Sequence, residues 1–86
     1  DSDVITLIRG NNLACVYISF YRAGHNYGSK PYFISVNEDE TEAQIIGAFI
    51  GQFYLNGEIP ANIILNYAPE EIKNKVKRYN KAGQNM

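Results

Sequence analysis

The sequence predicts a single small α+β domain whose elements follow the order β-β-β-α-β-α. Three observations lead to this prediction. The first 36 residues hold apolar runs rich in β-branched and aromatic residues, and turn-forming residues separate them. Residues 41–54 instead repeat apolar side chains every three or four positions, which is the period of a helix. A short apolar run and a second helical pattern follow, and 86 residues suffice for only one domain.

Three runs in the first part of the chain are predicted strands: 4–8, 13–21 and 31–36. Gly10-Asn11-Asn12 predicts the turn between the first two, because glycine and asparagine tolerate positive φ angles. Segment 22–29, which contains two glycines, predicts the tip of the second hairpin. Pro31 has no N–H to donate, so it should lie at a strand start or on an edge strand. The second run is apolar on both faces, which predicts a central strand covered on both sides.

The main helix is predicted to begin after Thr41. Thr41 and Gln44 have the spacing of a capping box, in which each side chain bonds the backbone N–H of the other residue. Asn56-Gly57 predicts the end of the helix through a left-handed cap, and Pro60 cannot continue it. The apolar face of this helix is broad and consists of Ile45, Ile46, Phe49, Ile50, Phe53 and Tyr54.

The last part of the chain predicts a fourth strand at 63–65 and a second helix. Pro69 suits the first turn of this helix, and Gly83 is predicted to end it. A narrow apolar stripe runs along it: Ile72, Val76 and Tyr79. This order of elements equally fits a β-hairpin sheet with helices on one face.

Charge and cysteine content exclude several classes of protein. The net charge is −1, so no overall field attracts the chain to nucleic acid. No apolar run approaches the roughly 20 residues of a membrane span, and no signal peptide is visible. Cys15, the one cysteine, cannot form an internal disulfide; we expect a small core residue in a cytoplasmic protein. Neither end of the chain has a closing element, which favours one domain over 1–86 within a larger protein.

Five segments, in fixed order, resemble the bacterial UvrABC system protein C family: Asp3-Val4-Ile5, Leu13 to Ile18, Arg22-Ala23-Gly24, Gly28 to Phe33, and GQFYLNGEIPANIIL over 51–65. The likeness extends from Asp3 to about Tyr67. It implies an internal segment of the DNA-incising subunit of the nucleotide excision repair excinuclease, an endonuclease that answers DNA damage in the SOS response. Neither the GIY-YIG signature nor the helix-hairpin-helix pattern of that family is present, so this segment would lie between the two nuclease halves.

The resemblance also implies a partial ribonuclease H-like fold, with three antiparallel strands, a fourth strand, and helices packed on the sheet. Active nucleases of this fold hold two metal ions with clustered carboxylates. Here Asp1 and Asp3 are predicted to precede the first strand, and Arg9 follows it. The acidic run Glu38-Asp39-Glu40 with Glu42 lacks the spacing of a calcium loop. We therefore expect no catalytic residue, no metal and no cofactor in this segment.

Four basic residues of the second helix are candidates for contacts with DNA phosphates: Lys73, Lys77, Lys81 and Arg78. The three lysines are spaced i, i+4, i+8 and so share one helix face, where each phosphate contact would add salt-dependent affinity. The alternative is a solvated face that complements the helix dipole. The implied partners, reached through the parent protein, are damaged DNA and the B component of the excinuclease, UvrABC system protein B. Whether this segment touches either one directly stays open.

Aromatic residues concentrate in the second hairpin: Tyr17, Tyr21, Tyr27, Tyr32 and Phe33. They favour either a contact surface for a neighbouring domain or the cover of a thin core. A second functional interpretation, independent of the resemblance, is an unrelated α+β module for protein–protein interaction. It predicts no link to DNA and a hairpin surface that binds protein.

Overall fold

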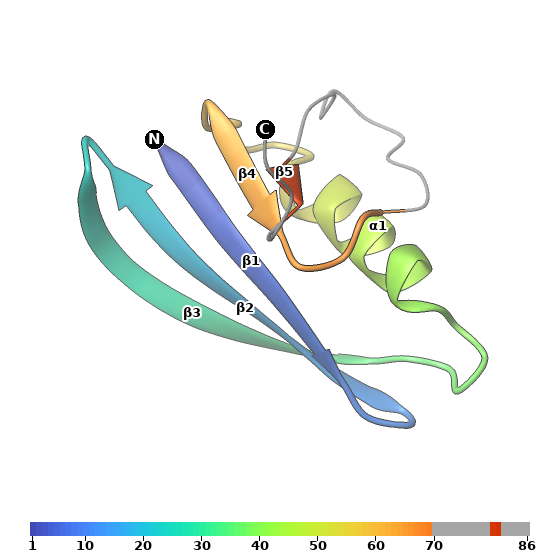
Figure 1. Ribbon diagram of the computed structural model, residues 1–86. Coiled ribbons are helices and arrows are strands. Elements are labelled where there is room, and N and C mark those ends of the chain that lie inside the picture. The colour runs from blue at the N-terminus through green and yellow to red at the C-terminus, as the bar shows by residue number, and fades with distance from the viewer. Residues whose placement is uncertain (70–79, 82–86) are drawn as a thin grey trace.

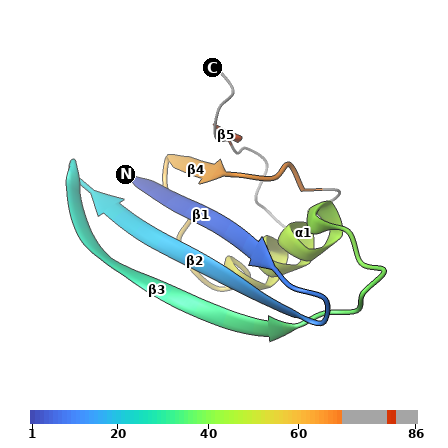
Figure 2. The ribbon, with the colours of Figure 1, turned by 60° about the horizontal axis from the view of Figure 1, so that its bottom comes forward.

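The computed structural model describes residues 1–69 and 80–81, with side chains over 1–69. A twisted sheet of strand order β3-β2-β1-β4-β5 carries one described helix across one face (Figures 1 and 2). The elements are β1 (Ser2–Arg9), β2 (Leu13–Arg22), β3 (His25–Ser35), α1 (Glu42–Phe53), β4 (Asn62–Leu65) and β5 (Asn80–Lys81). The first three strands are antiparallel, β4 runs parallel to β1, and β5 runs parallel to β4. Among the described residues, no helix has the length and apolar character that crossing a membrane requires.

The two hairpins differ in how closely they match the turns predicted from the sequence. The predicted turn after β1 is confirmed, with the Gly10 N–H donating to the Leu13 carbonyl over 2.7 Å. The predicted tip at 22–29 is wrong, because the chain reverses at Ala23 and Gly24, whose φ angles are 52° and 81°. Positive φ at both central residues matches the twist of a two-residue hairpin. The Asp1 carboxylate accepts the Ala23 N–H over 2.9 Å and holds this turn.

Helix α1 begins as predicted and ends earlier. The Gln44 N–H donates to the Thr41 hydroxyl over 3.1 Å, and the Thr41 N–H donates to the Gln44 side chain over 2.9 Å, so the capping box is confirmed. The last helical residue is Phe53, and Tyr54 caps the end. The left-handed end at Gly57 is wrong, since Gly57 is not among the described glycines with positive φ. The buried Tyr54 side chain anchors the chain at this point instead.

The capping box gives a direct test of the helix start. Replacing Thr41 with alanine removes the acceptor for the Gln44 N–H, so the free energy of unfolding should fall by about 1 kcal/mol. Urea unfolding followed by circular dichroism measures this change. Thr41→Ser keeps the hydroxyl and should lose much less; equal losses in both variants would show that the hydroxyl does not cap α1.

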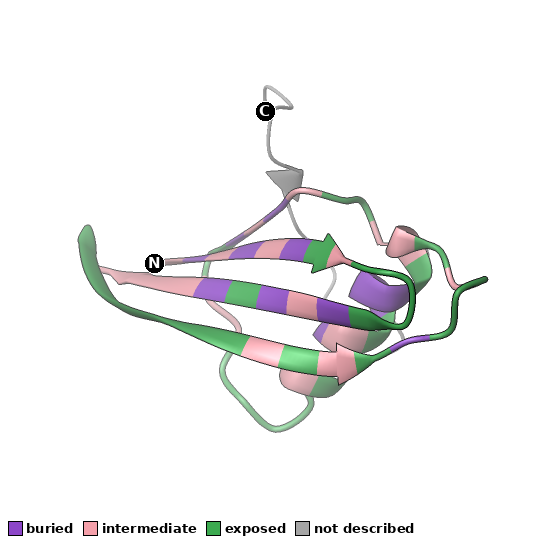
Figure 3. Cartoon of the chain, turned by 90° about the horizontal axis from the view of Figure 1, so that it is seen from below, coloured by how far each residue is buried: buried purple, intermediate pink, exposed green. Residues whose placement is uncertain are grey.

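One face of the sheet, covered by α1, holds the core. Burial alternates along β1 and β2, as the colour bands in Figure 3 show. The buried core residues are Ile5, Leu7, Ala14, Val16, Ile18, Val36, Ile45, Ile46, Ile50, Tyr54, Ile63 and Leu65. The opposite face of β2 contradicts the prediction of cover on both sides: Leu13 is 51% and Tyr17 44% exposed. Cys15 lies on that face and is half-buried, so its predicted place in the core is also wrong.

Strand β4 confirms the predicted strand at 63–65 and extends it by one residue. It pairs with β1 from Ser2 opposite Asn62 to Ile5 opposite Leu65. Beyond this ladder, the Asn66 side chain accepts the Leu7 N–H over 3.0 Å and donates to the Leu7 carbonyl over 3.1 Å. A side-chain amide thus takes the place of a backbone partner at the end of the strand pair.

Most of the predicted second helix lies outside the described residues. The exception is Asn80–Lys81, which is strand β5, paired with Ile64 and Leu65 of β4. The prediction that this helix continues to Gly83 is therefore wrong. The reason is non-local: a strand edge at β4 accepts these two residues, and helical periodicity in the sequence gives no sign of that edge.

Candidate functional site

A buried carboxylate lies inside β1. Asp3 is only 1% exposed and stands between Phe20 of β2 and Ile63 of β4. The prediction that Asp1 and Asp3 both precede the first strand is thus wrong for Asp3. The strand begins two residues earlier than its apolar run, because Ser2 and Asp3 find ladder partners on both sides.

Both oxygens of Asp3 are hydrogen-bonded. Arg22, the last residue of β2, places Nη1 2.8 Å from Oδ1. The Tyr54 hydroxyl donates to Oδ2 over 2.5 Å. Arg22 also donates to the Tyr21 carbonyl over 2.8 Å, and its Nε lies 3.9 Å from an oxygen of Asp1. We call Asp1, Asp3, Arg22 and Tyr54 the carboxylate cluster; it ties β1, the end of β2 and the end of α1 together.

Burial governs the ionisation of Tyr54 in this cluster. It raises the pKa of Tyr54 well above the ordinary tyrosine value, and the hydrogen bond and negative charge of Asp3 raise this pKa further. The positive charge of Arg22 opposes the shift. Tyr54 is therefore a neutral hydrogen-bond donor to Asp3. The described part of the chain contains no buried side-chain nitrogen or oxygen atom without a partner.

The raised pKa of Tyr54 makes stability depend on pH in the alkaline range. An unfolded tyrosine ionises near pH 10, whereas folded Tyr54 holds its proton to higher pH. Its contribution is therefore complete below about pH 10 and is lost as the pH rises toward the folded pKa. We expect the free energy of unfolding to fall above pH 10, and to fall less steeply in Tyr54→Phe. Chemical unfolding at pH 8 to 11 measures both slopes; parallel slopes would contradict the assignment.

The predicted acidic run shapes a loop. One Glu40 carboxylate oxygen accepts the Asn37 N–H over 2.7 Å. Arg9 donates to backbone carbonyls of Asn37 and Glu40, and so holds the same loop from β1. Among residues 1–69 and 80–81, no group of three His, Cys, Asp or Glu side chains is placed to hold a metal ion.

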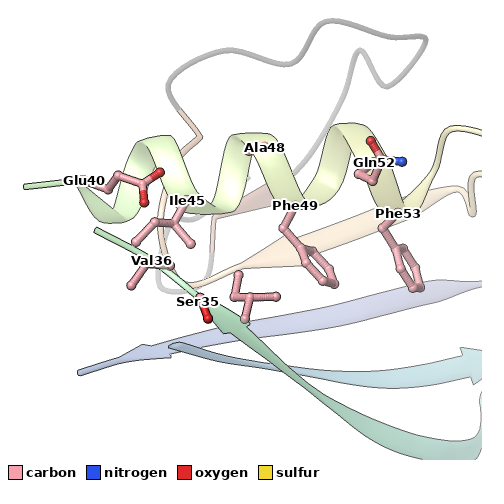
Figure 4. Close-up of a pocket in the computed structure, with 9 residues that line it drawn as sticks. Ser35, Val36, Glu40, Ile45, Ala48, Phe49, Gln52 and Phe53 are labelled. Carbon is pink, nitrogen blue, oxygen red and sulfur yellow. The ribbon is translucent and has the colours of Figure 1, made fainter. Parts of the chain in front are cut away.

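A pocket of about 410 Å³ lies between the end of β3 and α1 (Figure 4). Its lining consists of Ile34, Ser35, Val36, Glu40, Ile45, Ala48, Phe49, Gln52 and Phe53. Phe49 and Phe53 stack on one another with centroids 5.4 Å apart, and Tyr32 meets each ring edge-on at 5.6 Å. The wall of the pocket is thus mostly apolar, and two packed aromatic rings, Phe49 and Phe53, form part of it.

Within the part of the chain that the structure describes, the face of the sheet opposite α1 is open to solvent and carries no charged side chain. We call this the outer face and define it by ten residues of β1, β2 and β3 that the alternation of the paired strands places there: Val4, Thr6, Ile8, Leu13, Cys15, Tyr17, Ser19, Pro31, Phe33 and Ser35. Ile8 is 63% and Phe33 68% exposed. Ile8, Cys15 and Phe33 stand in one row across three strands. Depletion of charge with exposed aromatic residues is typical of the centre of a protein interface.

A comparison with known families gives a match over nearly the whole chain. The family described as "UvrC Ribonuclease H-like domain" matches residues 1–83. The chain belongs to this family. Both the resemblance seen in the sequence and the α+β, ribonuclease H-like fold class are thereby confirmed. The second interpretation, an unrelated module, is excluded.

Three curated relatives of this UvrC ribonuclease H-like domain carry the name UvrABC system protein C. The one from Rickettsia prowazekii is 35% identical over 81 residues, which is 94% of this chain and 13% of the relative. That from Ruegeria sp. is 42% identical over 66 residues, 77% of this chain and 10% of the relative. That from Methylococcus capsulatus is 36% identical over 73 residues, which is 85% of this chain and 12% of the relative. The chain thus spans a small part of these relatives. No solved structure matches it significantly.

The structure of this UvrC domain does not bring the residues predicted as functional together in one site. Lys73, Lys77 and Arg78 lie outside the described residues, and Lys81 is placed only as part of β5. The hairpin aromatics divide between two roles: Tyr17, Tyr27 and Phe33 are exposed, whereas Tyr32 packs on α1. The buried cluster at Asp3 was missed. An aspartate that starts an apolar run, with a tyrosine at the end of the next helix, is the only signal that the sequence offers.

Proposed function

We propose that this chain is a non-catalytic ribonuclease H-like module within a DNA-incising subunit of bacterial nucleotide excision repair. Its work is to position the two nuclease halves of the longer protein, which dock on the outer face. The observation that carries the proposal is this uncharged face, on which Ile8, Tyr17 and Phe33 meet solvent. The narrow share of the relatives that the chain spans supports the presence of neighbouring parts.

The carboxylate cluster supports the non-catalytic part of the proposal. A two-metal nuclease needs carboxylate oxygens that are free to bind cations. Both oxygens of Asp3 instead accept hydrogen bonds, from Arg22 and Tyr54, and the Arg22 charge would repel a cation. We therefore propose that Asp3 is a structural residue and that the module works without metal or cofactor.

The docking role is tested in the full-length protein that carries this segment. Tyr17→Glu with Phe33→Glu places two charges on the outer face, and we expect less of both incisions and faster cleavage between domains in limited proteolysis. Tyr27→Glu, an exposed residue beyond this face, is the control. Unchanged incision in the double variant would refute docking. Separately, metal-dependent nicking of duplex DNA by the 86-residue chain, lost in Asp3→Asn, would refute the non-catalytic role.

We further propose that the longer protein is cytoplasmic and that this module contacts DNA or UvrABC system protein B directly. The basis for direct contact is the i, i+4 spacing of Lys73 and Lys77, together with Arg78. Lys81 lies in strand β5 and so falls outside this helical pattern. Fluorescence anisotropy of a labelled duplex at two salt concentrations tests the DNA contact. Binding that weakens with salt, and weakens in Lys73→Glu with Lys77→Glu, supports it. Absence of binding leaves UvrABC system protein B as the contact to test, by the same variants.

A further inference from the structure

The outer edge of β3 exposes backbone groups at every second residue. The Val36 N–H donates to Asn12, and the Gly10 N–H donates to Leu13. Antiparallel ladders alternate, so these two bonds fix the pattern: even-numbered residues of β2 bond β3, and odd-numbered ones bond β1. On β3, the N–H and carbonyl groups of Ile34 therefore point toward β2, whereas those of Phe33 and Ser35 point away from the sheet.

The two halves of this edge differ. Tyr27 and Gly28 both oppose Phe20, which makes a bulge, and Pro31 lacks an N–H at an outward position. Bulges and edge prolines prevent the addition of another strand. The segment 32–35 has neither device. The half of the edge that remains open to pairing is thus the half that borders the pocket.

The pocket lies where a side chain of an added strand would enter. Ile34 and Ser35 of the open edge line it from one side, and Ala48 and Gln52 of α1 are exposed on the other. An added strand alternates its side chains, so one of them would point into the space beside Ile34. About 410 Å³ with mostly apolar walls accommodates a large apolar side chain.

A strong negative charge stands at one end of the same groove. The loop from β3 to α1 carries Glu38, Asp39 and Glu40, and Glu42 opens the helix. Glu40 also lines the pocket. Arg9 contributes one positive charge to this loop, bonded to backbone carbonyls, and the described ion pairs include none of these four carboxylates. An occupant of the groove is therefore favoured when it carries Lys or Arg at this end.

We propose that the groove between β3 and α1 binds an extended peptide segment of a partner protein. The segment pairs with the backbone of Phe33 and Ser35, inserts one large apolar side chain beside Ile34, and sets a Lys or Arg against the acidic loop. This is strand addition to a sheet edge, with a side-chain pocket for specificity. The groove and the outer face share Phe33 and Ser35: the groove uses their backbone edge, whereas the outer face presents their side chains. The groove is tested by peptide binding to the 86-residue chain and the docking role by incision in the full-length protein, so the failure of one can be told from the failure of the other.

The test measures binding of two fluorescein-labelled peptides to the 86-residue chain: Lys-Lys-Thr-Phe-Thr-Val-Thr and its reverse. We expect one of them to bind with a Kd below about 100 μM, and replacement of its Phe by Ala or of both Lys by Glu to weaken binding at least about tenfold. In an NMR titration, the amide signals of Phe33 and Ser35 should shift. Failure of both peptides to bind overturns the proposal.

Matched variants of the protein locate the site. Ala48→Phe fills the pocket from an exposed helix position and should weaken binding at least about tenfold. Ala61→Phe, the same change at an exposed alanine outside the pocket, should leave binding unchanged. Glu38→Gln with Asp39→Asn should weaken it severalfold and reduce its dependence on salt. Equal binding by the Ala48 and Ala61 variants overturns the proposal.

Two other occupants of the groove would give different experimental results. If the 86-residue chain dimerises in sedimentation experiments and Ala48→Phe abolishes the dimer, a second copy occupies the groove, and the proposal is wrong. If the peptide binds the 86-residue chain but not the full-length protein, a segment of the same polypeptide fills the groove, which also overturns a partner in trans.

Discussion

Replacement of Asp3 by alanine is expected to lower the free energy of unfolding by about 3 kcal/mol. The change leaves the hydroxyl of Tyr54 buried without its acceptor, and it removes the counter-charge of Arg22. The side chain of Arg22 is one-third exposed, so water compensates part of its loss, and most of the cost arises at Tyr54. Urea unfolding gives the magnitude.

A double-mutant cycle shows whether Asp3 and Tyr54 act as a unit. Tyr54→Phe alone should cost about 2 kcal/mol, because one buried carboxylate oxygen loses its donor. The two losses should not add, since either change removes the same hydrogen bond. Asp1→Asn is the control: an amide oxygen can still accept the Ala23 N–H, and the half-exposed Asp1 carboxylate lies 3.9 Å from Arg22, so the loss should be small. Additive losses at Asp3 and Tyr54 would contradict this account.

The second large effect is expected at the centre of the core. Ile46 of α1 is fully buried against the sheet, so Ile46→Ala should cost about 3 kcal/mol through lost burial and the resulting cavity. Total stability of a chain this short is only about 5 to 10 kcal/mol. The urea midpoint should fall sharply at an unchanged slope.

Ile8→Ala is the matched control for this effect. It deletes the same atoms from an isoleucine on the outer face that is 63% exposed. A loss below about 1 kcal/mol is expected in the isolated chain, since little apolar area leaves contact with protein. Similar losses at Ile8 and Ile46 would show that the outer face is covered in solution.

Features set by neighbouring residues could be predicted from the sequence. Thr41 and Gln44 are three positions apart and satisfy each other, so the start of α1 needs no tertiary information. The turn at Gly10 follows equally from its own residues. The end of α1 does not, because Tyr54 leaves the helix to reach Asp3, which lies 51 residues away in the sequence.

The candidate sites depended on long-range contacts, which the sequence pattern does not contain. Periodicity showed that Leu13, Cys15 and Tyr17 share one face of β2, but not that this face is open. A carboxylate beside an apolar run is usually exposed to solvent. Asp3 departs from this rule only because Arg22 and Tyr54 come from other elements to meet it. The pocket also requires β3 and α1 to be placed against each other.

The alternation of hydrogen bonds along β3 has a kinetic consequence. Amide hydrogens of Tyr32 and Ile34 are held by β2 and exchange with deuterium only when the hairpin opens, whereas those of Phe33 and Ser35 face solvent and exchange almost as fast as in an unfolded chain. Neighbouring positions on one strand thus differ by orders of magnitude in lifetime. Residues 33 and 35 therefore act as a built-in reporter: slowing of their exchange, at unchanged rates for 32 and 34, registers an occupied edge without any change in global stability.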